Sequence, residues 1–362
     1  MAVPQRLSIL TIWHEAEFSM RVAAICTSVT LALVPTSTAV AEVEFGKVVA
    51  YKGICEPSGA IAFPAGTIDQ VFIVANDETN GLKAYRAAGG DPLDMPSGDL
   101  NKFLGLNDEE EDNKADFEGA TWLNDRAYWI GSHSRSRKGN IRHPRWQLFA
   151  TRVSAASGAP TIAPTSEQAF NGLLPALSAL DPKLKAKIEL DKAMDEGLTP
   201  DNKGFNIEGL TARADGKSLM LGLRSPLLGE DFNQAVLIPL ENPEGVVERK
   251  QQPVLRPSIL VNLGGRGVRS IEYSGAARAY FILAGPAGND RGTFELYKWP
   301  AEESDPPTPV PGFSAALQKL DKFQPEALVV DSTGKKIHLF SDDGDSCNIG
   351  APAFRGVLVT LD

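Results

Sequence analysis

The same short pattern occurs five times along this chain: a glutamate, an apolar run, a turn, and a second apolar run that ends in polar or turn-forming residues. The runs are rich in Val, Ile, Phe, Tyr, Trp and Ala, which is the composition typical of β-strands. Repetition of one unit constrains the fold strongly, because every copy is expected to form the same structure. The repeated glutamates are Glu56, Glu118, Glu208, Glu272 and Glu326.

Each repeat has the length and the connections of an antiparallel sheet. Successive glutamates lie between 54 and 90 residues apart. The turn within a repeat is short, as at Asn124-Asp125, so it joins an antiparallel hairpin and leaves no room for the helix that a parallel crossover needs. Radial repetition of such sheets protects their edges. We therefore predict an all-β fold, a five- or six-bladed β-propeller with a short helical insertion.

The interval between Glu118 and Glu208 is the longest, and it contains the one stretch with a helical pattern. Residues 181–194 begin with an Asp-Pro pair and continue in strong helix formers. We predict an insertion near residues 165–203 within a single propeller domain that spans residues 42–362. The sequence leaves open whether this insertion covers the channel mouth and whether the interval hides a sixth blade.

The first residues have the pattern of an export signal. Met20 and Arg21 precede an apolar stretch that is too short to span a membrane, and Ala39-Val40-Ala41 is a small-x-small cleavage site. The upstream residues include two glutamates, which the positively charged start of a signal avoids, so we predict that translation starts at Met20. Residues 1–41 are predicted to be a signal peptide, and the mature protein to be periplasmic or secreted.

Two cysteines remain in the mature chain, Cys55 and Cys347. Cys55 precedes the first repeat and Cys347 follows the last one, so both lie on one face if the first and last blades are neighbours. Disulfides persist in the exported compartment. We predict a Cys55–Cys347 disulfide, with two free thiols as the alternative. We also predict that residues 44–51 pair with the C-terminal strand at residues 355–361 to complete one blade.

The hairpin geometry predicts a ligand-binding site. In an antiparallel hairpin the start of the first strand lies beside the end of the second, so each glutamate shares a rim with the residues that close its hairpin. If the first strands are innermost, the carboxylates surround one mouth of the central channel, and Arg224 is partly buried against Glu208. The predicted ligand-binding residues are Glu56, Glu118, His133, Arg135, Glu208, Arg224, Arg269, Glu272, Glu326, Asp342 and Asp343.

These residue types favour particular ligands. Clustered carboxylates favour a hard cation such as Ca²⁺, and arginines suit phosphate or carboxylate groups. Zinc is disfavoured because the histidines lack the usual ligand spacing. The alternative is structural, with the glutamates tying adjacent blades together. The predicted metal ligands are Glu118, Glu208, Glu272 and Glu326.

The charge distribution limits the kinds of molecule that this protein is expected to bind. The formal net charge is −10, and acidic and basic residues are interspersed, so no nucleic-acid partner is predicted. One local exception is a basic cluster within residues 135–145, which fits either a solvated loop or an anion-binding role. The mature protein is predicted to be a monomer without a stable membrane span.

Several phrases carry a resemblance that covers nearly all of the mature chain. In order they are GSHSRSRKGN, FNIEGLTARADGKSLMLGLRSPLL, LENP, GGRGVRSIEY, ILAGP, PEALVV and LFSDDG. They resemble the bacterial family called domain of unknown function 3616, which implies no established activity. The Glu-Gly openings are similar, more weakly, to phytase-like esterase propellers, which would imply phosphate-ester chemistry at a channel mouth.

Three functions remain as hypotheses. The first is an exported propeller that binds a small anionic or metal-bridged ligand at the channel mouth. The second is a periplasmic calcium-dependent phosphoesterase, in which a metal-activated water attacks the ester. The third is a protein-interaction module. No serine-nucleophile elbow, Walker loop or dinucleotide fingerprint occurs in the sequence, and whether the chain is an enzyme stays open.

Overall fold

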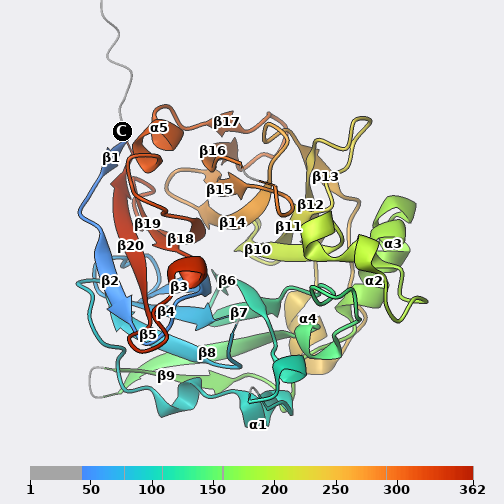
Figure 1. Cartoon of the computed structure of the whole chain (residues 1–362), viewed down its shortest axis with the longest axis horizontal. Helices are drawn as coiled ribbons and strands as arrows, with labels where there is room; N and C mark the ends of the chain where they lie inside the picture. The colour runs from blue at the N-terminus through green and yellow to red at the C-terminus, as the bar shows by residue number, and fades with distance from the viewer. Residues whose placement is uncertain (1–42, 77, 108, 157–158, 291, 362) are drawn as a thin grey trace, which may run out of the picture. The chain divides into compact units, whose positions relative to one another are not determined.

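The computed structural model describes residues 43–361 except 77, 108, 157–158 and 291 (Figure 1). The predicted signal peptide lies outside the described residues. The described residues from 43 onward belong to one compact unit that is mostly β-structure, which confirms the β-rich character of the predicted fold. None of the helices described has both the length and the apolar composition needed to cross a lipid bilayer.

The described strands form five antiparallel sheets. The first sheet contains β3 (Pro57–Phe63), β4 (Val71–Asn76) and β5 (Leu82–Arg86). The second contains β6 (Phe117–Leu123), β7 (Arg126–Gly131), β8 (Leu148–Ala156) and β9 (Ala159–Pro164). The third contains β10 (Asn206–Ala212), β11 (Leu219–Ser225), β12 (Ala235–Leu240) and β13 (Ile259–Val261). The fourth contains β14 (Gly267–Ser274), β15 (Ala279–Gly285), β16 (Glu295–Pro300) and β17 (Thr308–Pro309).

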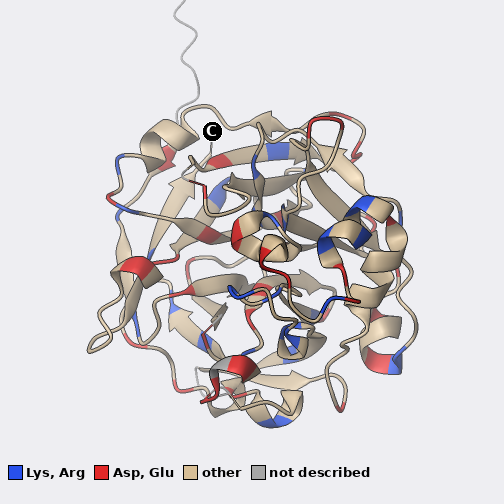
Figure 2. Ribbon diagram, turned by 45° about the vertical axis from the view of Figure 1, so that its right-hand side comes forward, with Lys and Arg blue, Asp and Glu red and all other residues tan. Residues whose placement is uncertain are grey.

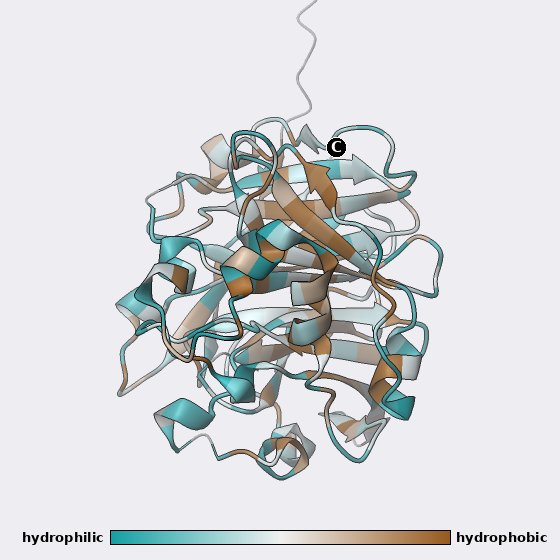
Figure 3. Ribbon diagram, turned by 90° about the vertical axis from the view of Figure 1, so that its right-hand side faces the viewer, coloured by the Kyte–Doolittle hydropathy of each residue, from teal (hydrophilic) through white to brown (hydrophobic). Residues whose placement is uncertain are grey.

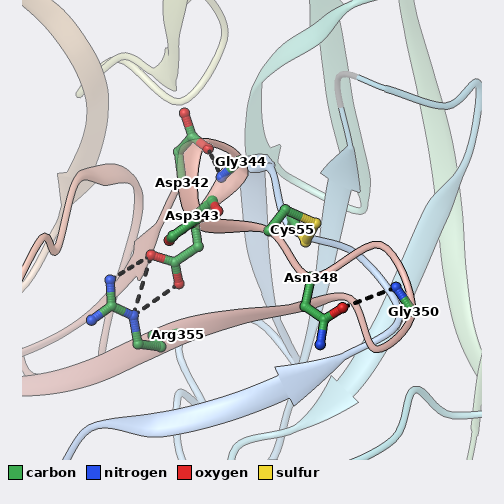
Figure 4. The surroundings of a disulfide bond; sticks show 9 residues. Cys55, Asp342, Asp343, Gly344, Asn348, Gly350 and Arg355 are labelled. Atoms are coloured by element: carbon green, nitrogen blue, oxygen red, sulfur yellow. Dashed lines mark hydrogen bonds and ion pairs between the residues drawn. A yellow bond between two sulfur atoms is a disulfide. The ribbon is translucent and has the colours of Figure 1, made fainter.

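The fifth sheet is built from both ends of the described chain. It contains β18 (Pro325–Val330), β19 (Lys336–Ser341) and β20 (Ala353–Thr360), and β1 (Glu44–Phe45) and β2 (Val49–Lys52) both pair with β20. The predicted pairing of the N-terminal segment with the C-terminal strand is therefore confirmed. The predicted disulfide is also present, and it joins Cys55 to Cys347 across 292 residues with a Cα–Cα distance of 5.7 Å (Figure 4).

The first strands of the five sheets contact one another in sequence: β3 with β6, β6 with β10, β10 with β14, β14 with β18, and β18 with β3. This is a propeller-like arrangement in which the first strand of each sheet is innermost (Figure 1). Apolar residues gather in the strands and polar residues in the connections (Figure 3). Side chains such as Trp129, Trp299 and Phe340 are fully buried between the sheets.

Each first strand contains a register irregularity near its beginning. In β6, Phe117 pairs with Gly131 and Gly119 with Ile130, so Glu118 is the extra residue of a bulge. The same shift falls at Glu208, Arg269 and Glu326, and in β3 it spans Ser58 and Gly59. The equivalent residues of the five sheets are Ser58, Glu118, Glu208, Arg269 and Glu326. The alignment that gives Glu56 and Glu272 this position is wrong.

The residue after each bulge is small because the inner strands lie close together. A Cβ atom on Gly119 would lie 2.9 Å from the Cβ of Leu210, and a Cβ on Gly59 would lie 2.9 Å from the backbone of Gly119. Both distances are shorter than a normal van der Waals contact. In each Glu-Gly pair of the sequence, the glycine is therefore required by the packing of the inner strands, and the glutamate supplies the charge.

A second set of equivalent positions ties neighbouring sheets together. Three residues after the bulge, a side-chain oxygen accepts a hydrogen bond from a backbone N–H of the next inner strand. The three bonds are Ala212 N to Thr121 Oγ1 (3.1 Å), Tyr273 N to Thr211 Oγ1 (2.8 Å) and Val330 N to Glu272 Oε2 (2.7 Å). Glu272 thus occupies the position of the two threonines and has their structural role.

The helices lie in the connections between strands. They are α1 (Asn101–Leu104), α2 (Leu173–Leu180), α3 (Pro182–Ile188), α4 (Pro243–Arg249) and α5 (Phe313–Leu317). Asp181 caps α3 by accepting from Lys183 N at 2.6 Å. The helix ends earlier than predicted because Glu189 has a left-handed backbone, with φ of 45°. The strands β8 and β9, in the interval suspected of hiding a sixth blade, belong to the second sheet.

Removing one of the ties between sheets should destabilise the fold. Thr211→Val keeps the shape of the side chain but leaves the partly buried N–H of Tyr273 without its acceptor, so we expect the free energy of unfolding to fall by about 1–3 kcal/mol. The exposed strand residue Thr161 provides the control, because Thr161→Val makes the same chemical change in β9. Urea denaturation measures both variants, and an equal effect of the two would contradict the role of Thr211.

Candidate functional site

A pocket of about 610 Å³ lies where the bulged residues of four sheets come together. Among the residues that the structure describes, ten acidic and seven basic side chains line it, and we call it the acidic pocket. Acidic and basic segments are intermingled in the connecting loops (Figure 2). Most lining residues come from five segments, 112–118, 134–145, 200–208, 286–294 and 324–345.

Three carboxylates meet in this pocket, Glu118, Glu208 and Glu326, and we call them the carboxylate cluster. Each offers an oxygen atom, and these oxygens all lie within 4.8 Å of one another. The three side chains come from the second, third and fifth sheets, and each is the extra residue of its bulge. The side chain of Glu208 is 1 % exposed and that of Glu326 11 %. The equivalent bulges therefore bring the three carboxylates to one place.

Arg269, the bulged residue of the fourth sheet, lies between two of these carboxylates. Its Nε is 3.0 Å from Glu208 Oε2, and its Nη2 contacts Glu326 Oε1. The Nε and Oε2 atoms are not aligned as a hydrogen bond, so the contact with Glu208 is ionic. Burial lowers the pKa of Arg269, and the Glu208 carboxylate opposes this effect. Arg269 therefore acts as an internal counter-ion for the carboxylate cluster.

Arg224 pairs with the other oxygen of Glu208. Its Nη1 donates to Glu208 Oε1 at 3.0 Å, which confirms the predicted pairing. Its Nε donates to Pro286 O at 3.2 Å and its Nη2 to Gly288 O at 3.1 Å. Although burial alone lowers the pKa of Arg224, the Glu208 carboxylate raises it above the usual value. Because all three of its nitrogens donate within the protein, Arg224 ties β11 to the loop after β15.

The two neighbouring aspartates of the last repeat, Asp342 and Asp343, have different surroundings. Asp342 lines the acidic pocket and accepts from Gly344 N at 2.8 Å, and burial raises its pKa. Asp343 turns the other way, toward Arg355, whose Nη2 donates to Asp343 Oδ1 at 2.6 Å (Figure 4). Ser341 also donates to Asp343, at 2.9 Å. Of the two, only Asp342 belongs to the pocket.

Two further predicted residues, Glu56 and His133, lie outside the acidic pocket. Glu56 packs against Gly344, where an added Cβ would overlap the glutamate carboxylate. His133 has a left-handed backbone with φ of 56°, and its Nδ1 lies 2.8 Å from Gly131 O. Burial lowers the pKa of His133 to about 4. Neither Glu56 nor His133 is among the described residues that line the acidic pocket.

Arg135 lies at the edge of the pocket, but its guanidinium is used inside the protein. It donates to four backbone carbonyls: Gly139 O (2.9 Å), Ile188 O (3.1 Å), Glu189 O (2.7 Å) and Lys192 O (2.9 Å). Three of these carbonyls lie at or just after the end of α3. Arg135 therefore fastens the helical insertion to the loop that follows β7.

The sequence interpretation missed most of the pocket wall. Asn206 donates to Glu208 Oε1 at 3.0 Å, and the loops at 200–203 and 286–290 supply Asp201, Asn289 and Asp290. Asp201, Asn289 and Asp290 come from connections with no repeated pattern, and Asn206 is the first residue of β10. The basic cluster at 135–145 was the one wall segment that composition alone could identify.

Comparisons with known proteins identify a family but no activity. A family model described as "Protein of unknown function (DUF3616)" matches residues 64–155 and 163–321. No curated protein sequence matches. Similar solved structures include the hydrazine synthase of Kuenenia stuttgartiensis, with 10% identity, a TM-score of 0.35, and coverage of 79% of this chain and 65% of that chain.

Two further solved structures have similar values. One is a nidogen/laminin complex, with 10% identity, a TM-score of 0.39, and coverage of 84% of this chain and 85% of that chain. The other is a putative gluconolactonase, with 11% identity, a TM-score of 0.37, and coverage of 89% of this chain and 93% of that chain. At these values the similarities transfer no function to this chain.

Loss of the internal counter-ion should be costly. Arg269→Ala leaves Glu208 and Glu326 buried without their shared cation, so we expect the free energy of unfolding to fall by about 3–5 kcal/mol. The exposed pair of Arg278 and Glu302 provides the control, because water screens this pair and Arg278→Ala should change stability far less than Arg269→Ala does. Chemical denaturation at neutral pH compares the two, and similar small losses would contradict the counter-ion role.

The tie made by Glu272 should make stability depend on pH. Burial raises the pKa of Glu272 to about 8 from the ordinary value of 4.5, so the folded protein keeps a proton that the unfolded chain loses. The contribution of Glu272 is therefore full below pH 4.5 and declines as pH rises toward 8.

Glu272→Gln cannot ionise and retains an oxygen acceptor for Val330 N. We expect its stability relative to wild type to rise between pH 5 and pH 8. Thermal denaturation over that pH range measures the difference, in which the titration of the other residues cancels. A difference that stays constant with pH would show that Glu272 does not carry the proton.

Proposed function

We propose that this chain, which belongs to the DUF3616 family of proteins of unknown function, is an exported five-bladed β-propeller that binds a small ligand in the acidic pocket. In this proposal a divalent cation such as Ca²⁺ bridges the carboxylate cluster and an anionic group of the ligand. The observation that carries the proposal is the convergence of Glu118, Glu208 and Glu326 within 4.8 Å.

The spacing of the cluster fits a calcium ion. Calcium binds six to eight oxygens at about 2.3–2.6 Å, so two oxygens on one ion lie at most about 5 Å apart. All three carboxylates of the cluster satisfy this limit. Glu208 is the poorest ligand of the three, because both of its oxygens contact arginines. The remaining ligands would come from Asp342, from water and from the bound molecule.

The local charge also favours a divalent cation. Four carboxylates, those of the cluster and Asp342, line the pocket together with the guanidinium groups of Arg224 and Arg269. Four negative and two positive groups leave a surplus of two negative charges when all are ionised. A divalent ion would balance this surplus. Its remaining coordination positions would attract an anionic group of the ligand.

The size of the pocket and the disulfide support the rest of the proposal. A volume of about 610 Å³ falls within the range of small-molecule sites, which is about 300–1,000 Å³. The Cys55–Cys347 disulfide supports export, because such bonds persist in oxidising compartments. Five sheets with a ring of contacting first strands support five blades.

Calcium binding provides the test. After treatment with a chelator, the mature protein should show a Ca²⁺-dependent rise in melting temperature, because an ion that binds only the folded state stabilises it by about 2.7 kcal/mol at 100 times its Kd. Isothermal titration calorimetry should give one Ca²⁺ site. Glu118→Gln should remove both effects.

Glu244 provides the matched control, because it forms an exposed pair with Arg249 on α4 and does not line the pocket. Glu244→Gln should bind Ca²⁺ as wild type does. No heat and no thermal shift in wild type would overturn the calcium site. The phosphoesterase alternative predicts that the Ca²⁺-loaded protein also releases phosphate from phosphate monoesters, and that Glu118→Gln does not.

A further inference from the structure

The loop after β7 places two exposed cations on the rim of the acidic pocket. Arg137 and Lys138 both line the pocket, and both are exposed. Within the part of the chain that the structure describes, neither of them forms an ion pair. Two other basic residues of this loop are paired with acids: Arg142 with Asp112 at 2.5 Å and Arg145 with Asp116 at 2.8 Å.

The turn that carries these two cations has a defined conformation. Ser136 N donates to Asn140 O at 2.9 Å, and Ser136 Oγ accepts from Lys138 N at 3.2 Å and from Asn140 N at 3.1 Å. Gly139 has φ of 78°, and a Cβ there would lie 2.4 Å from Asp195 O. The turn is thus packed against the helical insertion, with Gly139 as the residue that permits the contact.

Arg135 also holds the turn at residues 136–140 in place. It donates to Gly139 O and to three carbonyls around the end of α3, so the turn and the insertion are held by one buried guanidinium. A binding group that is held in place before the ligand arrives loses less conformational entropy on binding. The hydrogen bonds of Arg135 hold in place the backbone that carries Arg137 and Lys138.

Three acidic residues that line the acidic pocket have cationic partners of their own. Asp112 and Asp116 are paired with arginines, and Glu78 pairs with Lys114 at 2.5 Å. A neighbouring shallow hollow of about 730 Å³ shares Asp112, Lys138 and Arg142 with the acidic pocket. Lys138 therefore borders both hollows, and Arg137 borders the acidic pocket.

We propose that Arg137 and Lys138 form an anion subsite that selects the ligand of the acidic pocket. This inference rests on the proposed function and narrows it: the ligand is a small molecule with two separated anionic groups. One group completes the coordination of the cation at the carboxylate cluster. The other forms charge-assisted hydrogen bonds with Arg137 and Lys138.

Two sugar phosphates that differ by one phosphate group provide matched probes. Isothermal titration calorimetry compares fructose 6-phosphate with fructose 1,6-bisphosphate, each with and without saturating Ca²⁺. Wild type should bind the bisphosphate about tenfold or more tightly than the monophosphate, because two additional charge-assisted contacts form. The double variant Arg137→Gln/Lys138→Gln should bind the two probes with similar affinity and should bind Ca²⁺ as wild type does.

Arg86 and Lys102 provide the matched control, because they are an exposed arginine and an exposed lysine that do not line the pocket. Arg86→Gln/Lys102→Gln has the same change in net charge and should keep the wild-type preference. The anion subsite is overturned if the Arg137/Lys138 variant keeps the preference, if the control loses it equally, or if wild type binds neither probe.

The calcium titrations separate this inference from the proposed function. Failure of wild type to bind Ca²⁺ would overturn the cation at the carboxylate cluster. If the bisphosphate preference then persists without Ca²⁺ and disappears in the Arg137/Lys138 variant, the anion subsite is supported by itself. Normal Ca²⁺ binding together with an unchanged preference in that variant would overturn the subsite and leave the calcium proposal standing.

Discussion

The close approach of the inner strands is the constraint on which the rest of this structure depends. Neighbouring first strands lie so near one another that Gly59 and Gly119 have no space for a Cβ. The bulge immediately before each small residue places an extra side chain at the same point of every sheet. The packing of the inner strands therefore determines where charged side chains come together, independently of any ligand.

The gathering of carboxylates creates an electrostatic problem that the protein solves with its own cations. Three carboxylates within 4.8 Å repel one another strongly when two of them are nearly removed from water. The fourth sheet has Arg269 at the equivalent position, and Arg224 comes from the second strand of the third sheet. The resulting network joins three sheets, so the structural role and the binding role of these glutamates are compatible. Both roles use the same residues, because the bulges bring these side chains together at the centre.

Much of the architecture could be predicted from the sequence, because it rests on local patterns. The repeated apolar runs and short turns predicted the antiparallel sheets, and the positions of Cys55 and Cys347 predicted the disulfide that the structure contains. The equivalence of the repeats was harder to predict. Glu56 and Glu272 lie two and three residues from the bulge, where the charge of the side chain is a misleading guide. The better signal is an extra residue followed by a small one, as in Pro-Ser-Gly, Phe-Glu-Gly and Val-Arg-Ser.

The pocket walls could not be predicted because loops bring them together. Arg135 is an example: within the sequence it belongs to a basic cluster, yet its guanidinium is used to hold carbonyls at the end of α3. This contact depends on an insertion more than fifty residues away. The same contact gives the insertion a part in the site, since it braces the turn that carries Arg137 and Lys138. A buried cation that lines a pocket can thus serve mainly to orient exposed ones, and only the contacts of each guanidinium distinguish the two roles.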